Sequence, residues 1–169
     1  MKEQDAMGQL RLDLALSRAI DQRVDGVVRA AASVVALLRE DRLMRENQVR
    51  NLLDVAASTE SLLAVSNFVR YQMGRSAQDR AWLHNGFGER IVKEIEDRTG
   101  TVQKLSAEVA QEVRAEIPAI DTTKLTALAR LRLARLFLGY LNRWFYYASR
   151  TKEGWDDVER FVRQEAAHV

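Results

Sequence analysis

The stretch DTTKLTALARLRLARLFLGYLNRWFYYASRT, residues 121–151, decides the fold of this chain. Asp121 is a residue type that caps helix N-termini, and the residues behind it include no proline and a single glycine. Most of the expected helix circumference is apolar, which is typical of a helix in a protein core. A membrane span is not expected, because charges at the bilayer centre are costly and this window holds Arg130, Arg132, Arg135 and Arg143.

The segments on either side have the same helical character. The chain has one proline and eight glycines among 169 residues, and apolar residues recur at helical spacing. Helices are expected over residues 6–24, 27–43, 46–57, from Ser58 or Thr59 to 74, 82–98, 101–117 and 155–167, with breaks at Gly26, Gly100 and Pro118 and an interruption near Asn85, Gly86 and Gly88. Only Leu10, Leu12, Leu14 and Leu16 alternate as in a strand. The sequence predicts an all-α fold: a compact bundle of about six to eight helices, forming one domain over residues 1–169.

The composition excludes several classes of site. The chain has no cysteine, which rules out a disulfide scaffold, a thiolate zinc site, an iron–sulfur cluster and a cysteine nucleophile. The two histidines, His84 and His168, lie far apart, so we expect no catalytic residue, no metal and no cofactor. The N-terminal segment is charged throughout, unlike a signal peptide, so we expect a soluble cytoplasmic protein without a membrane partner.

Charge is distributed unevenly along the chain. The basic residues comprise 21 arginines and five lysines, and the net charge is only +2. Residues 124–152 nevertheless hold seven basic and no acidic side chains, whereas residues 153–169 hold two basic and five acidic ones. Codon bias explains a preference for arginine over lysine, but it does not explain the absence of Asp and Glu from one helix.

The basic residues of the long helix share one side of it. At about 100° per residue, Arg132, Arg135, Arg143 and Arg150 fall in one sector together with Gly139 and Tyr146, and Lys124 prolongs it. We call these residues the arginine stripe. A helix that is buried on most sides and open along such a stripe suits a nucleic-acid backbone. The alternative is that these arginines pair with the glutamates of 101–117, which include Glu108, Glu112 and Glu116, or with the acidic tail.

A second basic region lies earlier in the chain. Arg50, Arg70 and Arg75 occur within residues 46–78, and no acidic residue lies between Glu60 and Asp79. We expect this region to contribute further contacts to RNA.

Two motifs in this region carry a family resemblance. Asn47, Gln48, Val49, Arg50, Asn51 and Leu52 resemble a segment at a helix start in the helical small subunit of type III CRISPR effector complexes, the Csm/Cmr small-subunit family. The stretch Arg70-Tyr71-Gln72 is similar to the helix that follows it in that family. The resemblance covers about 30 residues, and the basic C-terminal helix agrees with it in character.

The resemblance implies a non-catalytic α-helical protein in antiviral defence. Several copies stack on one another beside the backbone subunits of the complex and line the groove that holds the guide RNA and target RNA. Arg50 and Gln48 are the positions that the resemblance assigns to RNA or subunit contacts. The acidic helix at 101–117 and the acidic tail after 153 depart from the family pattern.

Two other functions stay open. Arg163 and His168 form an R-x4-H pattern that resembles the signature of HEPN ribonucleases, which are helical RNA-binding proteins. Glu165 and His168 also form one E-x-x-H, but a di-iron centre needs two copies and two further carboxylates. The other alternative is a helical interaction module that docks its basic stripe on an acidic protein.

Overall fold

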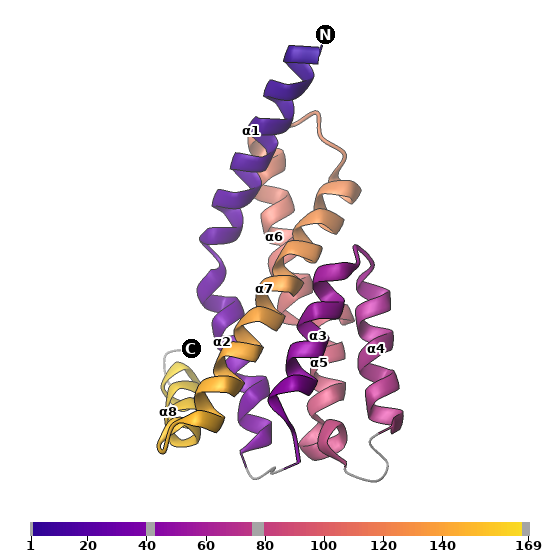
Figure 1. Cartoon of the computed structure of the whole chain (residues 1–169). Coiled ribbons are helices and arrows are strands. Elements are labelled where there is room, and N and C mark those ends of the chain that lie inside the picture. Colours follow the sequence, from indigo (N-terminus) through magenta and orange to yellow (C-terminus); the bar gives the residue numbers. More distant parts are fainter. Residues whose placement is uncertain (1, 40–42, 76–79, 167–169) are drawn as a thin grey trace.

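The computed structural model describes residues 2–39, 43–75 and 80–166. These residues form no strand, and their helices are α1 (Lys2–Asp21), α2 (Val24–Val35), the 3-10 helix η1 (Ala36–Leu38), α3 (Glu46–Ser58), α4 (Leu62–Arg75), the 3-10 helix η2 (Ala81–Gly86), α5 (Phe87–Glu96), α6 (Thr101–Glu116), α7 (Thr122–Arg150) and α8 (Gly154–Ala166) (Figure 1). The predicted all-α bundle with a long helix near the C-terminus is confirmed.

α7 is the central helix of the bundle. It runs obliquely across the molecule in Figure 1 and packs against α6, α2, α3, α8 and α1. Its buried side chains extend over its whole length: Leu125, Ala129, Leu131, Leu133, Ala134, Phe137, Leu138, Leu141, Phe145 and Ala148. Because neighbouring helices surround α7, every residue from 128 to 142 is buried or half-buried.

Two predicted signals mark the boundary between α6 and α7. α6 ends at Glu116, two residues before Pro118, which cannot donate a helical hydrogen bond. The carboxylate of Asp121 accepts hydrogen bonds from the backbone N–H groups of Thr123 at 2.9 Å and Lys124 at 3.4 Å. Asp121 therefore caps α7 as its position in the sequence predicted.

The predicted interruption near residue 86 is also confirmed. The chain passes from η2 to α5 through Asn85 and Gly86, both with positive φ. The left-handed region favours glycine, so a substitution of Gly86 would be strained there.

Two other boundaries differ from the sequence prediction. The break expected at Gly26 lies between Asp21 and Val24, and Gly26 is inside α2. The cap expected at Ser58 or Thr59 is instead Ser61, whose hydroxyl oxygen accepts a hydrogen bond from the N–H of Ala64 at 3.3 Å. Hydroxyl residues occur at positions 58, 59 and 61, so residue type alone does not specify which of them is the cap.

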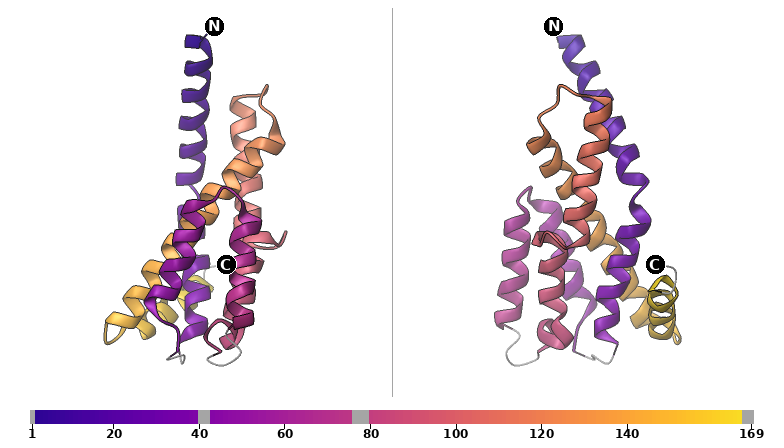
Figure 2. Two further views of the ribbon diagram at one scale, coloured as in Figure 1. Left: turned by 45° about the vertical axis from the view of Figure 1, so that its right-hand side comes forward. Right: turned by 180° about the vertical axis from the view of Figure 1, so that it is seen from behind.

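α1 lies beside α6, as the view from behind shows (Figure 2). Ion pairs join α6 to α1 and to the turn that follows it: Arg18 of α1 contacts Glu116, and Arg23 of the turn contacts Glu108 at 3.2 Å and Glu112 at 2.7 Å. The first turns of α1 extend beyond the rest of the bundle (Figure 1). No helix of the described residues is both long enough and apolar enough to cross a membrane.

Candidate nucleic-acid interface

The middle part of the arginine stripe, from Arg132 to Arg143, lies in a groove between α1 and α7, which we call the α1–α7 groove. The groove has a volume of about 470 Å³ and is lined by Ser17, Ile20 and Asp21 of α1 and by Arg132, Arg135, Leu136, Gly139, Tyr140 and Arg143 of α7. The sequence correctly placed three arginines and Gly139 on one side of α7. Gly139 leaves open space at the base of the groove, because nothing lies within 4 Å of where its Cβ would be.

Arg132 is held by an ion pair with α1. Its Nη2 lies 2.9 Å from Oδ1 of Asp13, and both side chains remain more than a third exposed. Hydrogen bonds from Gln9 and from Arg132 lower the pKa of Asp13. The positive charge of Arg132 is therefore compensated inside the protein.

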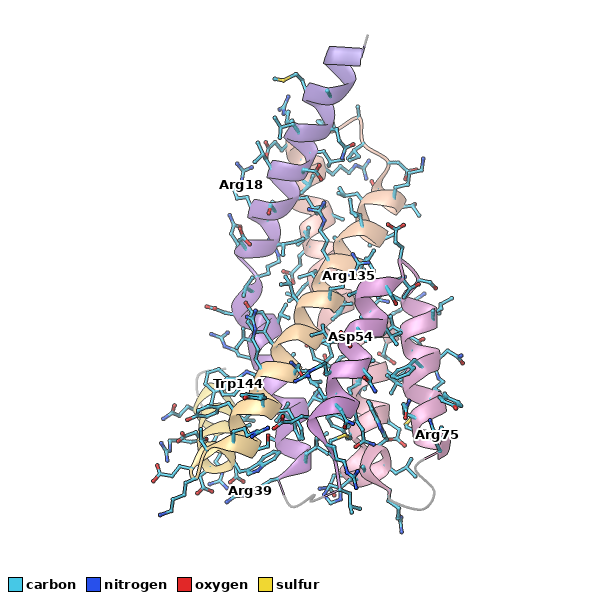
Figure 3. The ribbon with its side chains drawn as sticks, in the orientation of Figure 1. Arg18, Arg39, Asp54, Arg75, Arg135 and Trp144 are labelled. Atoms are coloured by element: carbon cyan, nitrogen blue, oxygen red, sulfur yellow. The ribbon has the colours of Figure 1, made fainter. Side chains whose placement is uncertain are left out.

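Arg135 has neutral partners instead. Its Nε donates to the carbonyl oxygen of Ala56 at 3.0 Å, and its Nη2 donates to that of Thr59 at 2.9 Å. These carbonyls lie at the C-terminal end of α3, where helical backbone acceptors lack partners within the helix. Arg135 of α7 thus stabilises the contact with α3 (Figure 3). Because both acceptors are neutral, they do not neutralise its positive charge at the groove.

Arg143 is the exposed arginine of the groove. Its guanidinium carbon lies 5.2 Å from the centre of the Tyr140 ring. Among the described residues, no carboxylate forms an ion pair with it. Arg143 is therefore a charged donor group that is available to a ligand.

The two ends of the stripe differ. Arg150 makes two hydrogen bonds to the carboxylate of Glu46, at 2.5 and 3.0 Å, and its guanidinium lies over the Tyr146 ring. The hydrogen bond lowers the pKa of Glu46 and raises that of Arg150. Lys124 is exposed in the first turn of α7.

The stripe is thus not a continuous open face, contrary to the sequence prediction. α1 and α3 pack against its middle, so that its arginines lie at the bottom of a groove or bind other helices. The partners named in the alternative prediction are also wrong. The glutamates of α6 pair with Arg18 and Arg23, while Asp156 and Glu159 of α8 pair with Arg39.

The second basic region is separate from the groove. Arg70 binds Glu96 through two hydrogen bonds, at 3.1 and 2.7 Å, and this contact lowers the pKa of Glu96. The guanidinium of Arg75 lies 5.4 Å from the ring centre of Tyr71. Arg75 lies at the foot of α4, far from Arg135 on α7 (Figure 3).

The residues of the first resemblance motif lie at the start of α3. The side-chain oxygen of Gln48 accepts a hydrogen bond from the N–H of Arg45 at 2.9 Å, so Gln48 stabilises the helix start. Arg50 is exposed. Val49 and Leu52 are buried. Of this motif, Arg50 is the basic side chain that is open to solvent.

A second cavity continues from the groove at Arg143 and Tyr140, and we call it the aromatic pocket. It has a volume of about 550 Å³ and is lined by Val28, Tyr140, Arg143, Trp144, Tyr147, Asp157, Arg160, Phe161 and Gln164. Trp144 lies between α7 and α8 (Figure 3). Sequence reasoning missed this pocket, because four of its nine lining residues come from α8, whose place beside α7 is set by tertiary packing. The grouping of Arg143, Trp144 and Tyr147 within one helical turn of the sequence was the signal that could have indicated it.

The residues of the ribonuclease and metal patterns lie at the C-terminus. Arg163 pairs with Glu159 at 2.9 Å, and His168 lies outside the described residues. Within the described part of the chain, no three His, Asp or Glu side chains are grouped so as to hold a metal ion.

Comparisons with protein-family models, with curated proteins and with solved structures give no match to this chain.

Proposed function

We propose that this protein is the non-catalytic small subunit of a type III CRISPR RNA-guided effector complex in antiviral defence, and that it binds the backbone of guide or target RNA in the α1–α7 groove. The observation that carries RNA binding is Arg143, an exposed guanidinium at the junction of groove and aromatic pocket that has no carboxylate partner among the residues that the structure describes. The assignment to this class of complex rests on the resemblance of residues 47–52 and 70–72.

The charge balance of the groove supports an anionic ligand. Arg132 is compensated by Asp13, whereas, within the described part of the chain, Arg135 binds neutral carbonyls and Arg143 has no acidic partner. Among the described residues, the lining holds three arginines and one carboxylate, that of Asp21, so the groove keeps a net positive charge. Arg135 and Arg143 are eight residues apart, which is about 12 Å along a helix. Two guanidinium groups at this spacing suit phosphates of one strand and read no sequence.

The proposed assembly needs surfaces for backbone subunits and for further copies of this chain. α1 offers one, since Met7, Leu10 and Leu14 are exposed by 68%, 54% and 62%. Their i, i+3, i+7 spacing puts them on one face of the helix. Avidity from several joined copies would then compensate for the few phosphate contacts that each copy makes.

RNA binding is tested with the full-length protein and a fluorescent single-stranded RNA. Arg143→Gln should weaken binding several-fold at low salt and reduce the slope of log K against log salt by about 1, because one phosphate contact is lost. Arg114→Gln is the matched control, since Arg114 is exposed on α6 and lies outside the groove lining. Equal affinities of the two variants, or no binding by the wild-type protein at low salt, would contradict the proposal.

The assignment to an RNA-guided complex needs a separate experiment. The protein is purified from its native cells at low salt, and the nucleic acid that accompanies it is sized. We expect short RNAs of uniform length, together with the backbone subunits of the effector complex. Protein partners that stay bound after nuclease treatment, without RNA, would favour the interaction module.

A further inference from the structure

We propose that the aromatic pocket holds one base of the RNA strand whose phosphates lie in the α1–α7 groove. This inference rests on the function proposed above and deepens it, since it adds a base contact to the backbone contacts. It would give the protein a preference for unpaired nucleotides, because a base enters such a pocket only when it is turned out of a helix.

The walls of the pocket are suited to a flat ring. Trp144 of α7 and Phe161 of α8 lie with ring centres 5.1 Å apart and their planes tilted by 38°. Tyr147 approaches Trp144 edge-on, with centres 6.4 Å apart. Aromatic side chains from two helices thus form an open cavity, and every base has a face that stacks on such rings.

The polar groups of the pocket favour a nucleotide over a purely apolar ligand. Asp157 accepts hydrogen bonds from the hydroxyl of Tyr147 at 2.6 Å and pairs with Arg160 at 3.1 Å. With Arg143 also in the lining, two guanidinium groups face one carboxylate, and the pocket is positive overall. Gln164 adds an amide that both donates and accepts.

The groove and the pocket share two lining residues, so one RNA strand can reach both cavities. Tyr140 and Arg143 line both cavities, and the guanidinium of Arg143 stacks over the Tyr140 ring. A nucleotide whose phosphate contacts Arg143 therefore lies at the entrance of the pocket, and its base can stack on Trp144 without leaving the strand.

The test compares two RNA strands of equal length, one of uridines and one with the same backbone but without bases. The wild-type protein should bind the uridine strand roughly 5- to 100-fold more tightly, the range expected for stacking of one base. Trp144→Leu should abolish this preference and leave the affinity for the abasic strand unchanged, whereas Arg143→Gln should weaken both. Trp155→Leu is the matched control, because Trp155 is also a half-buried tryptophan packed against the core but lies outside the lining of the pocket and of the groove.

A measurement on the wild-type protein covers the case in which Trp144→Leu disturbs the packing of α8. A strand with 5-iodouridine is cross-linked by light, and the modified peptides are identified by mass spectrometry. Cross-links to Tyr140, Trp144, Tyr147 or Phe161 are expected. Cross-links confined to other aromatic residues, such as Tyr71, would overturn the inference.

The outcomes separate this inference from the proposed function. If neither strand binds at low salt, RNA binding itself is wrong. If both strands bind equally and Arg143→Gln weakens both, the backbone groove stands and the base pocket is wrong. Displacement of the strand by micromolar uridine monophosphate would also overturn the inference, because the pocket would then be a site for a free nucleotide.

Discussion

Arg135 and Arg143 lie on the same side of α7, yet their guanidinium groups have different surroundings. Arg135 donates two hydrogen bonds to carbonyl oxygens at the end of α3, whereas Arg143 is exposed over the ring of Tyr140. One residue type thus stabilises the contact between two helices at one position and is open to a ligand at the other. In the sequence, both are members of the same stripe.

The first prediction concerns the stability role of Arg135. Arg135→Met should lower the free energy of unfolding by about 2 kcal/mol, because two carbonyl oxygens lose a charged donor. Arg143→Met should change it by less than about 0.5 kcal/mol, as is usual for exposed positions. Urea denaturation followed by circular dichroism measures both, and equal stabilities of the two variants would refute the assigned role.

The second prediction concerns the pH dependence of the Arg70–Glu96 pair. The hydrogen bond from Arg70 lowers the pKa of Glu96 in the folded protein, so the stabilisation is present above the unfolded pKa and is lost as pH falls through the folded one. Glu96→Gln should therefore lower the free energy of unfolding by about 0.5 kcal/mol near pH 7, and the difference from wild type should shrink as pH falls below the ordinary glutamate pKa of about 4.3 and through the lower pKa of the folded protein. Urea titrations at several pH values measure it. A difference that grows on acidification would contradict this sign.

At the scale of the element, α1 explains the alternating leucines of its sequence. Leu12 is half-buried and Leu16 is buried, whereas Leu10 and Leu14 are exposed. Residues four apart share a face of a helix, so the alternation consists of two pairs on different faces. One pair packs on the core, and the other extends an apolar face that begins at Met7.

The third prediction concerns this face. If α1 contacts another copy of the chain, the wild-type protein should associate with rising concentration, and Leu10→Glu with Leu14→Glu should keep it monomeric with unchanged helix content. Sedimentation equilibrium measures the association. Leu63→Glu on α4 is the control, because Leu63 is 73% exposed on another helix. An effect of Leu63→Glu alone, or none from the α1 changes, would contradict this surface.

At the scale of the whole molecule, α7 holds the bundle together. It packs on α1, α2, α3, α6 and α8, so side chains at its middle contribute to several helix contacts at once. Phe137 is fully buried there. Loss of one such side chain should therefore weaken the whole bundle and not a single helix.

The fourth prediction follows from this central position. Phe137→Ala should lower the free energy of unfolding by about 3–5 kcal/mol, because transfer and cavity terms add. Urea denaturation followed by circular dichroism measures this change. If the loss exceeds the stability of the wild-type protein, the cooperative unfolding transition should disappear. Leu63→Ala, at an exposed position, should have little effect. A small change from Phe137→Ala would mean that α7 does not organise the core.

Ion pairs between distant segments make the charge of the folded surface differ from the charge pattern along the sequence. The glutamates of α6 bind the arginines of α1 and of the following turn, and the acids of α8 bind Arg39. A segment that is basic in sequence is therefore not a basic surface of the same extent. Of the stripe, Arg143 and Lys124 remain exposed without a carboxylate partner among the described residues.

The sequence by itself determined the helices, because the signals that form them act within a few residues. Apolar periodicity, the cap at Asp121 and the stop before Pro118 predicted α6 and α7 nearly to the residue. Only the tertiary structure decided which arginines are free. Arg132 meets Asp13 across 119 positions and Arg150 meets Glu46 across 104, and such contacts depend on how helices pack. The aromatic pocket arises in the same way, since α8 supplies a wall that the sequence of α7 does not encode.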